Sequence, residues 1–255
     1  MSVFHFKRFD VANEASSMKV NTDGVLLGAA VTLRSTDRRV LDVGTGTGTI
    51  ALMLAQRYSD LMAGEQRAFD CLRITGIDID GPSAAEAANN FFRSPWAPSL
   101  KAECCALSDF MPEEKLDLIV SNPPYFEDSL LPPEARRSLA RHTAGCALSY
   151  EDLVRFSGEN LEEDGRAALI LPADREQSLL RYAASFGFHA SRTLRIRTTP
   201  RKPPSRIVVE LSRVLEQDSF EDCLTIQDLR TYPHNKNGYT PEYRLLTGDF
   251  LKIFD

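Results

Sequence analysis

The sequence predicts an α/β fold, with a mostly parallel sheet that carries helices on both faces. Segments typical of strands alternate along the chain with segments typical of helices, which is the order of βαβ units. Several of these strands are apolar throughout, as strands buried on both faces must be. A chain of 255 residues, 43% of them hydrophobic, is long enough to bury such a core without disulfides or metals.

The elements follow one another in a regular order. A first helix is expected over 21–33, behind a cluster of capping residues. Strands are expected at the short apolar runs 39–43, 71–77, 101–107, 116–120, 167–171, 189–196 and 207–211. Helices are expected over 49–58, 84–92 (opened by Pro82), 150–161 (closed by Gly165) and 175–186, with 59–70 as a polar loop insertion. No helix separates the last two strands, so they should form an antiparallel hairpin at one sheet edge.

Composition limits the class of protein. The formal net charge of −6 argues against a protein that coats nucleic acid over its whole surface, although a local basic footprint is still possible. Five cysteines without a Cys-x-x-Cys pair and four scattered histidines give no zinc spacing, so we expect reduced cysteines and no metal. No signal peptide and no membrane-spanning run is visible. We expect a cytoplasmic protein without membrane association, and no feature indicates an obligate protein partner.

The first strand runs into Gly44-Thr45-Gly46-Thr47-Gly48. In open parallel sheets, ligands bind beyond the carboxyl ends of the strands. The third glycine of a dinucleotide fingerprint would fall at Thr49, so that loop type is not predicted. Acids mark this strand and the next two: Asp42, Asp78, which could accept hydrogen bonds from ribose hydroxyls, and Asp109. A tight connection followed by solvated acids is the alternative interpretation.

This succession resembles the class I methyltransferases, which bind S-adenosylmethionine. The run from Leu41 to Gly48 is similar to their glycine-rich motif, Asp78 to their ribose-binding acid, and Asp109 to the residue that contacts the adenine. Over residues 38–213, the resemblance implies a Rossmann-like sheet of seven strands with an antiparallel last strand.

The fourth strand ends in Asn122-Pro123-Pro124-Tyr125. The prolines fix the backbone and leave their carbonyls as free acceptors. The Asn122 side-chain oxygen and the Pro123 carbonyl could hold the two hydrogens of a planar amine, and Tyr125 could stack on a base. A rigid diproline turn before core aromatics is the alternative. The motif resembles that of methyltransferases acting on adenine N6 or on the glutamine amide of release factors.

The flanking segments favour RNA. Lys19-Val20-Asn21-Thr22-Asp23-Gly24 resembles the bacterial family that methylates N6 of adenine 37 in valine tRNA, and the likeness continues at 140–142, 200–206 and 242–250. It implies a single domain over 1–255, with a 38–213 core between extensions at 1–37 and 214–255. A release-factor glutamine methyltransferase and a non-catalytic S-adenosylmethionine- and RNA-binding protein are the alternatives.

Candidate site residues follow from these motifs. Asn122, Pro123, Pro124 and Tyr125 are the catalytic candidates. The residues expected to bind the cofactor are Lys19, Thr22, Asp23, Asp42, Gly44, Thr45, Gly46, Gly48, Asp78, Ile79, Asp109 and Asn122, although helix capping is an equal alternative for Thr22 and Asp23. The tRNA contacts are expected at Lys7, Arg8, Phe126, Arg141, His142, Arg201, Lys202 and Arg206. An N-terminal strand covering the sheet is the alternative for the first two.

Overall fold

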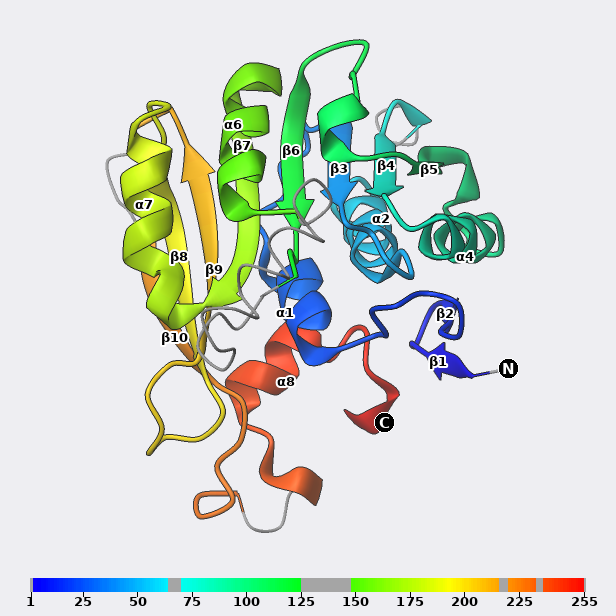
Figure 1. Ribbon diagram of the computed structural model, residues 1–255. Coiled ribbons are helices and arrows are strands. Elements are labelled where there is room, and N and C mark those ends of the chain that lie inside the picture. The colour runs from blue at the N-terminus through cyan, green and yellow to red at the C-terminus, as the bar shows by residue number, and fades with distance from the viewer. Residues whose placement is uncertain (1, 64–69, 125–147, 216–219, 233–235, 255) are drawn as a thin grey trace, which may run out of the picture.

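The computed structural model describes residues 2–63, 70–124, 148–215, 220–232 and 236–254. Its centre is an eight-stranded mixed sheet in the order β10-β8-β9-β7-β6-β3-β4-β5 (Figure 1). The strands are β3 (Arg39–Val43), β4 (Arg73–Asp78), β5 (Leu100–Cys104), β6 (Leu116–Ser121), β7 (Leu161–Pro172), β8 (His189–Arg197), β9 (Arg206–Ser212) and β10 (Phe220–Thr225). Only β9 runs antiparallel to its neighbours. The predicted fold class, Rossmann-like α/β, is confirmed.

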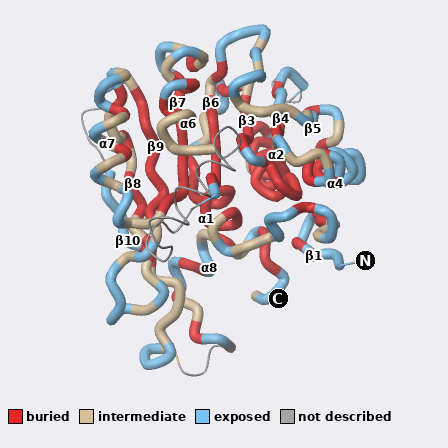
Figure 2. The backbone as a smooth tube through the Cα atoms, in the orientation of Figure 1, coloured by how far each residue is buried: buried red, intermediate tan, exposed pale blue. Residues whose placement is uncertain are grey.

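Helices cover both faces of the sheet. One face carries α1 (Thr22–Ala30), α2 (Thr49–Leu61), α4 (Gly81–Phe92) and α8 (Pro241–Thr247), and the other carries α6 (Tyr150–Asn160) and α7 (Glu176–Ala184). Successive strand residues point to opposite faces, so Val40 packs in the first core and Leu41 in the second. Figure 2 shows the buried strands between these layers. No helix in the described part of the chain has the length and apolar character needed to cross a bilayer.

Shorter elements complete the chain. A two-stranded antiparallel hairpin of β1 (Val3–His5) and β2 (Asp10–Ala12) precedes α1. Single 3₁₀ turns are η1 (Ala97–Ser99), η2 (Leu107–Asp109), η3 (Ala173–Arg175), η4 (Lys236–Gly238) and η5 (Lys252–Phe254). Of the expected elements, β3 has the predicted bounds.

The structure corrects three sequence-based expectations. The sheet has eight strands rather than seven because β10 pairs in parallel with β8, so the β8–β9 hairpin lies one strand inside the edge. Helix α2 continues to Leu61, so the polar segment 59–70 begins as helix. Gly165 does not close a helix: it lies inside β7, where a Cβ would stand 2.9 Å from the Leu116 carbonyl oxygen.

The strand directions place several loops at the same end of the sheet. All strands except β9 run in the same direction, so β3, β4 and β6 end beside one another. Strands β8 and β10 end at the same edge, and the loops that follow them are joined by a hydrogen bond from the Gln227 amide to the Thr198 carbonyl, 3.0 Å long. The loop containing Arg201 and Lys202 therefore lies at the same end of the sheet as the glycine loop, the end where the parallel strands finish.

A buried ion pair lies at the opposite end of the sheet. The Arg166 Nη2 and Asp37 Oδ2 atoms are 2.9 Å apart, and each side chain is 3% exposed. The Tyr58 hydroxyl donates to the same carboxylate at 2.6 Å, and Arg166 also donates to the Thr32 carbonyl at 3.0 Å. These contacts join β7 to α2 and to the turn before β3.

We expect Asp37→Ala to lower the free energy of unfolding by about 3–5 kcal/mol, because it leaves the Arg166 guanidinium buried without a counter-charge. Urea unfolding measures the change. Asp164→Ala is the control: this carboxylate is 75% exposed and 3.9 Å from Arg34, so its loss should matter by less than about 1 kcal/mol. Equal effects of the two substitutions would contradict the assignment.

Candidate active site

The glycine loop after β3 is a compact turn. Gly44, Gly46 and Gly48 all have positive φ angles, of 70°, 57° and 80°. The amides of Gly44 and Thr45 both donate to the Ile77 carbonyl at 2.9 Å, which ties the loop to the end of β4. At Gly48, the N-cap of α2, a Cβ would stand 2.4 Å from the Phe91 ring. Conformation and space both require glycine there.

Asp78, at the end of β4, fixes this loop from the side. One carboxylate oxygen accepts the Gly46 amide at 2.9 Å, and the other accepts the Asp80 amide at 2.9 Å. The side chain is half-buried and lines a cavity beside the loop. An acid at this point can accept hydrogen bonds from ribose hydroxyls, so the role predicted for Asp78 is compatible with its position.

Asp42 lies beneath the loop and is fully buried. The Thr45 hydroxyl donates to its Oδ2 at 2.7 Å, and its Oδ1 has no hydrogen-bond partner among the described residues. Burial raises the pKa of Asp42, the Thr45 hydrogen bond opposes this rise and the Asp78 charge adds to it, and together these effects bring the pKa to about 7. Asp42 therefore supports the loop from below through Thr45 and does not line the cavity.

A cavity of about 930 Å³ opens beside these residues. Its walls come from the glycine loop, from the ends of β4 and β6, from the segment after β5, from α6 and from the chain ahead of α1. The described lining residues closest to the motifs are Ser17, Met18, Gly44, Gly46, Asp78, Ile79, Ser108, Phe110, Asn122 and Pro124. Ile79 is 50% exposed, so a large apolar surface faces the cavity and suits a flat ring.

The Asn-Pro-Pro turn forms another part of the cavity wall. Asn122 is 7% exposed, and its amide nitrogen lies 3.7 Å from the Met18 sulfur. The preceding Ser121 hydroxyl donates to the Val43 carbonyl at 2.8 Å, which ties the end of β6 to the end of β3. Pro123 is buried and Pro124 is exposed. The turn and the glycine loop are therefore held as one unit.

The structure brings together some of the predicted site residues and separates others. Gly44, Gly46, Asp78, Ile79, Asn122 and Pro124 line one cavity. The other predicted catalytic and cofactor-binding residues that the structure describes do not line this cavity: Lys19, Thr22, Asp23, Asp42, Thr45, Gly48, Asp109 and Pro123. Predicted residues Tyr125, Phe126, Arg141 and His142 lie outside the described residues.

The separated residues have other contacts. The Lys19 ammonium donates to the Glu14 carbonyl at 2.5 Å. Asn21 caps α1 through a 2.8 Å bond from the Gly24 amide, so neither Thr22 nor Asp23 is the cap. Asp109 is exposed on η2, while its neighbours Ser108 and Phe110 line the cavity.

Sequence reasoning missed part of the lining. Phe110 directly follows the predicted Asp109, and both lie in the segment after β5, which ends at Cys104 rather than at the expected residue 107. Ser17 and Met18 carry no sequence signal of their own, because distant side chains hold them in place. Helix α6 contributes Asp152, Arg155 and Phe156, which was not predicted.

Several predicted RNA contacts are already paired within the protein. Arg8 lies 2.6 Å from Asp60 and over the Trp96 ring. The Arg206 Nε lies 2.8 Å from Asp23. Arg192 and Arg195 on the neighbouring β8, which are not predicted contacts, are paired with acids as well. Arg201 and Lys202 are exposed, and no ion pair joins them to another described residue. In the same stretch, Arg197 also has no ion pair with a described residue, but it is half-buried and donates to the Thr225 hydroxyl and the Pro200 carbonyl.

Known proteins resemble this chain at the levels of family, sequence and fold. The family model described as methyltransferase small domain matches residues 16–146. A tRNA1(Val) (adenine(37)-N6)-methyltransferase from Parabacteroides distasonis is 41% identical over 97% of this chain and 96% of its own length. A protein of the same name from Bacteroides fragilis is 38% identical, with 97% and 96% covered. A predicted O-methyltransferase from Agrobacterium tumefaciens has a TM-score of 0.63 at 16% identity, covering 89% of this chain and 96% of that one, a likeness of fold alone.

The raised pKa of Asp42 makes stability depend on pH in a definite direction. The folded protein holds a proton that the unfolded chain has lost between about pH 4 and pH 7. The stabilising contribution of the protonated carboxyl is complete below about pH 4 and is lost as the pH rises through about 7. Relative to Asp42→Asn, the wild type should lose up to about 1.4 kcal/mol of unfolding free energy per pH unit between pH 5 and 7.

Urea titrations of both proteins at pH 5, 6, 7 and 8 measure this difference. The asparagine variant removes the titrating group but keeps its shape, so it controls for every other ionisable side chain. Parallel stability profiles would show that Asp42 is already ionised in the folded protein at pH 5.

Proposed function

We propose that this chain, which belongs to the methyltransferase small domain family, methylates N6 of adenine 37 in valine tRNA. Within that family, it belongs to the tRNA1(Val) (adenine(37)-N6)-methyltransferases. The methyl donor is S-adenosylmethionine. One observation supports this function most directly: the Asn122 turn and the glycine loop face the same cavity. The release-factor and non-catalytic alternatives are not favoured, because the relatives are named as tRNA enzymes.

The residues of the cavity fit the cofactor. Asp78 offers carboxylate oxygens to ribose hydroxyls, Ile79 offers an apolar face to the adenine, and the turn at Gly44 and Gly46 lets the backbone approach closely. Ser108 and Phe110 border the same space. When bound, S-adenosylmethionine supplies a methyl group on a positively charged sulfur.

The Asn-Pro-Pro turn is proposed to hold the target amine. The exocyclic nitrogen of adenine is a weak nucleophile because its lone pair is conjugated with the ring. When the Asn122 oxygen and the Pro123 carbonyl accept its two hydrogens, the lone pair is directed into the cavity. The contact between the Asn122 amide nitrogen and the Met18 sulfur helps to orient this side chain. A base is not needed beforehand, because the proton can leave after the methyl group has been transferred.

The basic loop between β8 and β9 is proposed to bind the tRNA backbone. Arg201 and Lys202 project from the sheet edge that carries the cavity, and they are exposed. A net charge of −6 is compatible with RNA binding when the available cations are local. The target adenine, unpaired in the anticodon loop, would be drawn out of its stack into the cavity at modest cost. Lys7 and the paired Arg8 and Arg206 are secondary candidates, and a tRNA substrate agrees with the cytoplasmic location expected from the sequence.

We expect Asn122→Ala to lower the rate of methyl transfer to valine tRNA by about 100-fold or more, because one of the two acceptors of the amine is lost. The assay uses labelled S-adenosylmethionine and unmodified transcript. Binding of S-adenosylhomocysteine, measured by calorimetry, should stay close to the wild-type value. Undiminished transfer by the variant would remove Asn122 from catalysis, and transfer to a release factor but not to RNA would overturn the proposed substrate.

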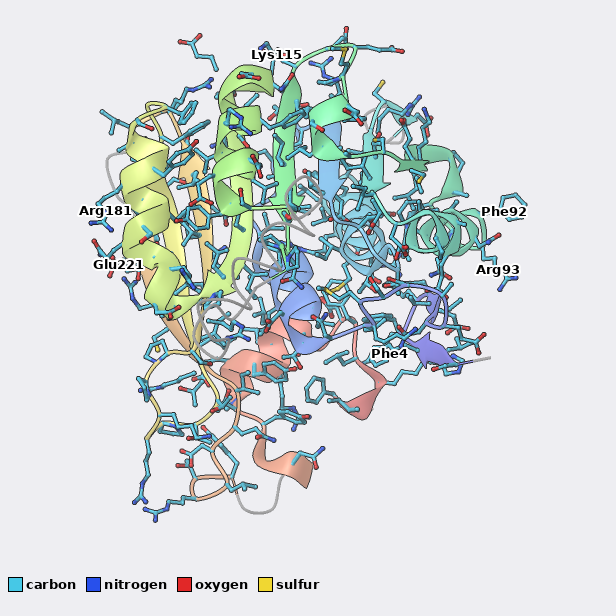
Figure 3. All side chains as sticks on the ribbon, viewed as in Figure 1. Phe4, Phe92, Arg93, Lys115, Arg181 and Glu221 are labelled. Atoms are coloured by element: carbon cyan, nitrogen blue, oxygen red, sulfur yellow. The ribbon has the colours of Figure 1, made fainter. Side chains whose placement is uncertain are left out.

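Charge reversal tests the basic loop. Arg201→Glu and Lys202→Glu should each weaken tRNA binding and reduce the slope of log affinity against log salt by about 1. Arg181→Glu is the matched control, because this arginine projects from the outer face of α7 (Figure 3) and its reversal changes the net charge equally. If all three variants bind with the same affinity and salt slope, the loop does not contact the backbone.

A further inference from the structure

The chain ahead of α1 crosses directly over the glycine loop. We call residues 12–18 the N-terminal strap. A Cβ on Gly46 would stand 3.4 Å from the Ser16 hydroxyl and 3.6 Å from the Met18 carbonyl, so strap and loop are in close contact. Ser17 and Met18 line the cavity. The strap is therefore a wall of the cofactor pocket, although it is not part of the sheet.

A single carboxylate on α4 holds the middle of the strap. The two Glu86 side-chain oxygens accept three successive backbone amides, those of Glu14 at 2.7 Å, Ala15 at 2.8 Å and Ser16 at 2.9 Å. Successive amides that converge in this way form a concave site for an anion. Glu86 is 7% exposed, and its pKa is lowered because these three bonds together outweigh the cost of burial.

Asn90, one turn further along α4, links the strap to the glycine loop. Its side-chain oxygen accepts the Ala12 amide at 2.8 Å, and its nitrogen donates to the Ala12 carbonyl at 3.0 Å. The same nitrogen donates to the Thr47 carbonyl, inside the loop, at 2.9 Å. Asn90 is 2% exposed. One amide group therefore sets the distance between two walls of the pocket.

The strap also reaches the catalytic turn. Ser16 donates to the Met18 carbonyl at 3.0 Å, which bends the chain so that the Met18 sulfur meets the Asn122 amide at 3.7 Å. The contacts made by Glu86 thus lead through Ser16 and Met18 to the side chain proposed to hold the target amine. Glu86, Ser16 and Met18 all lie outside the sheet that carries the motifs.

We propose that Glu86 and Asn90 are positioning residues for cofactor binding, which hold the strap so that Met18 closes the pocket beside Asn122. This inference rests on the proposed function, because the pocket is taken to be that of S-adenosylmethionine. A carboxylate is needed because three donors converge on two acceptor oxygens. Glutamine has one acceptor oxygen and would turn its own NH₂ group toward a backbone N–H.

The test compares Glu86→Gln and Glu86→Ala with Asn89→Ala as the matched control. Asn89 is exposed on the same helix and donates only to the Ala85 carbonyl, within α4. The measurements are the dissociation constant of S-adenosylhomocysteine by calorimetry, the KM for S-adenosylmethionine, and tRNA affinity without cofactor. Hydrogen exchange of residues 14–16 reports the strap directly.

For Glu86→Ala we expect the dissociation constant and the KM for S-adenosylmethionine to rise roughly tenfold or more, since buried amides lose their acceptor. Glu86→Gln should show a smaller rise, and hydrogen exchange of the strap amides should quicken in both. Affinity for tRNA and all properties of Asn89→Ala should stay at wild-type values. This pattern separates positioning from a general loss of fold, which would lower tRNA affinity as well.

Unchanged cofactor affinity in Glu86→Gln and Glu86→Ala would overturn the inference. If Glu86→Ala does not fold, the isosteric Glu86→Gln decides alone, with faster exchange of residues 14–16 and a raised KM as the supporting result. A wild-type protein that binds no S-adenosylhomocysteine would instead overturn the proposed function, so the two failures are distinct.

Discussion

The tight packing of the glycine loop is the constraint around which the site is built. A Cβ at Gly48 would overlap the Phe91 ring at 2.4 Å, and one at Gly76 would stand 2.6 Å from the Thr45 hydroxyl. The loop is therefore in close van der Waals contact with α4 on one side and with β4 on the other, and the strap covers Gly46. Helix α4, strand β4 and the strap thus all contact the same loop, so a change in any of them alters the cavity.

The fold was largely predictable because its strands are buried on both faces and its helices are interposed regularly. Strand β3 has the predicted bounds, and the β8–β9 hairpin follows from the missing helix. Strand β10 escaped prediction because Leu224 is its only buried residue, which leaves no apolar run or alternation to detect. Gly165 was predicted to end a helix, but it is required by close backbone packing inside β7. A sequence alone does not distinguish a glycine of this kind from one that ends a helix.

The candidate site was predictable where it depends on strand ends and unpredictable where it depends on long-range hydrogen bonds. Asp78 and Asn122 follow β4 and β6, so parallel pairing brings them to one edge. The strap is held by Glu86 from about 70 residues away, and nothing local in its sequence reports this. Likewise Arg206 looked available for RNA, because the acid that pairs with it, Asp23, lies in another element.

We propose that N6 of an adenine in tRNA is methylated in the cavity shared by the glycine loop and the Asn-Pro-Pro turn. Nucleoside mass spectrometry of valine tRNA, purified from cells with and without the gene, tests it most directly. We expect N6-methyladenosine in the fragment containing position 37 only when the gene is present. The same amount of N6-methyladenosine in that fragment from both kinds of cell would contradict it.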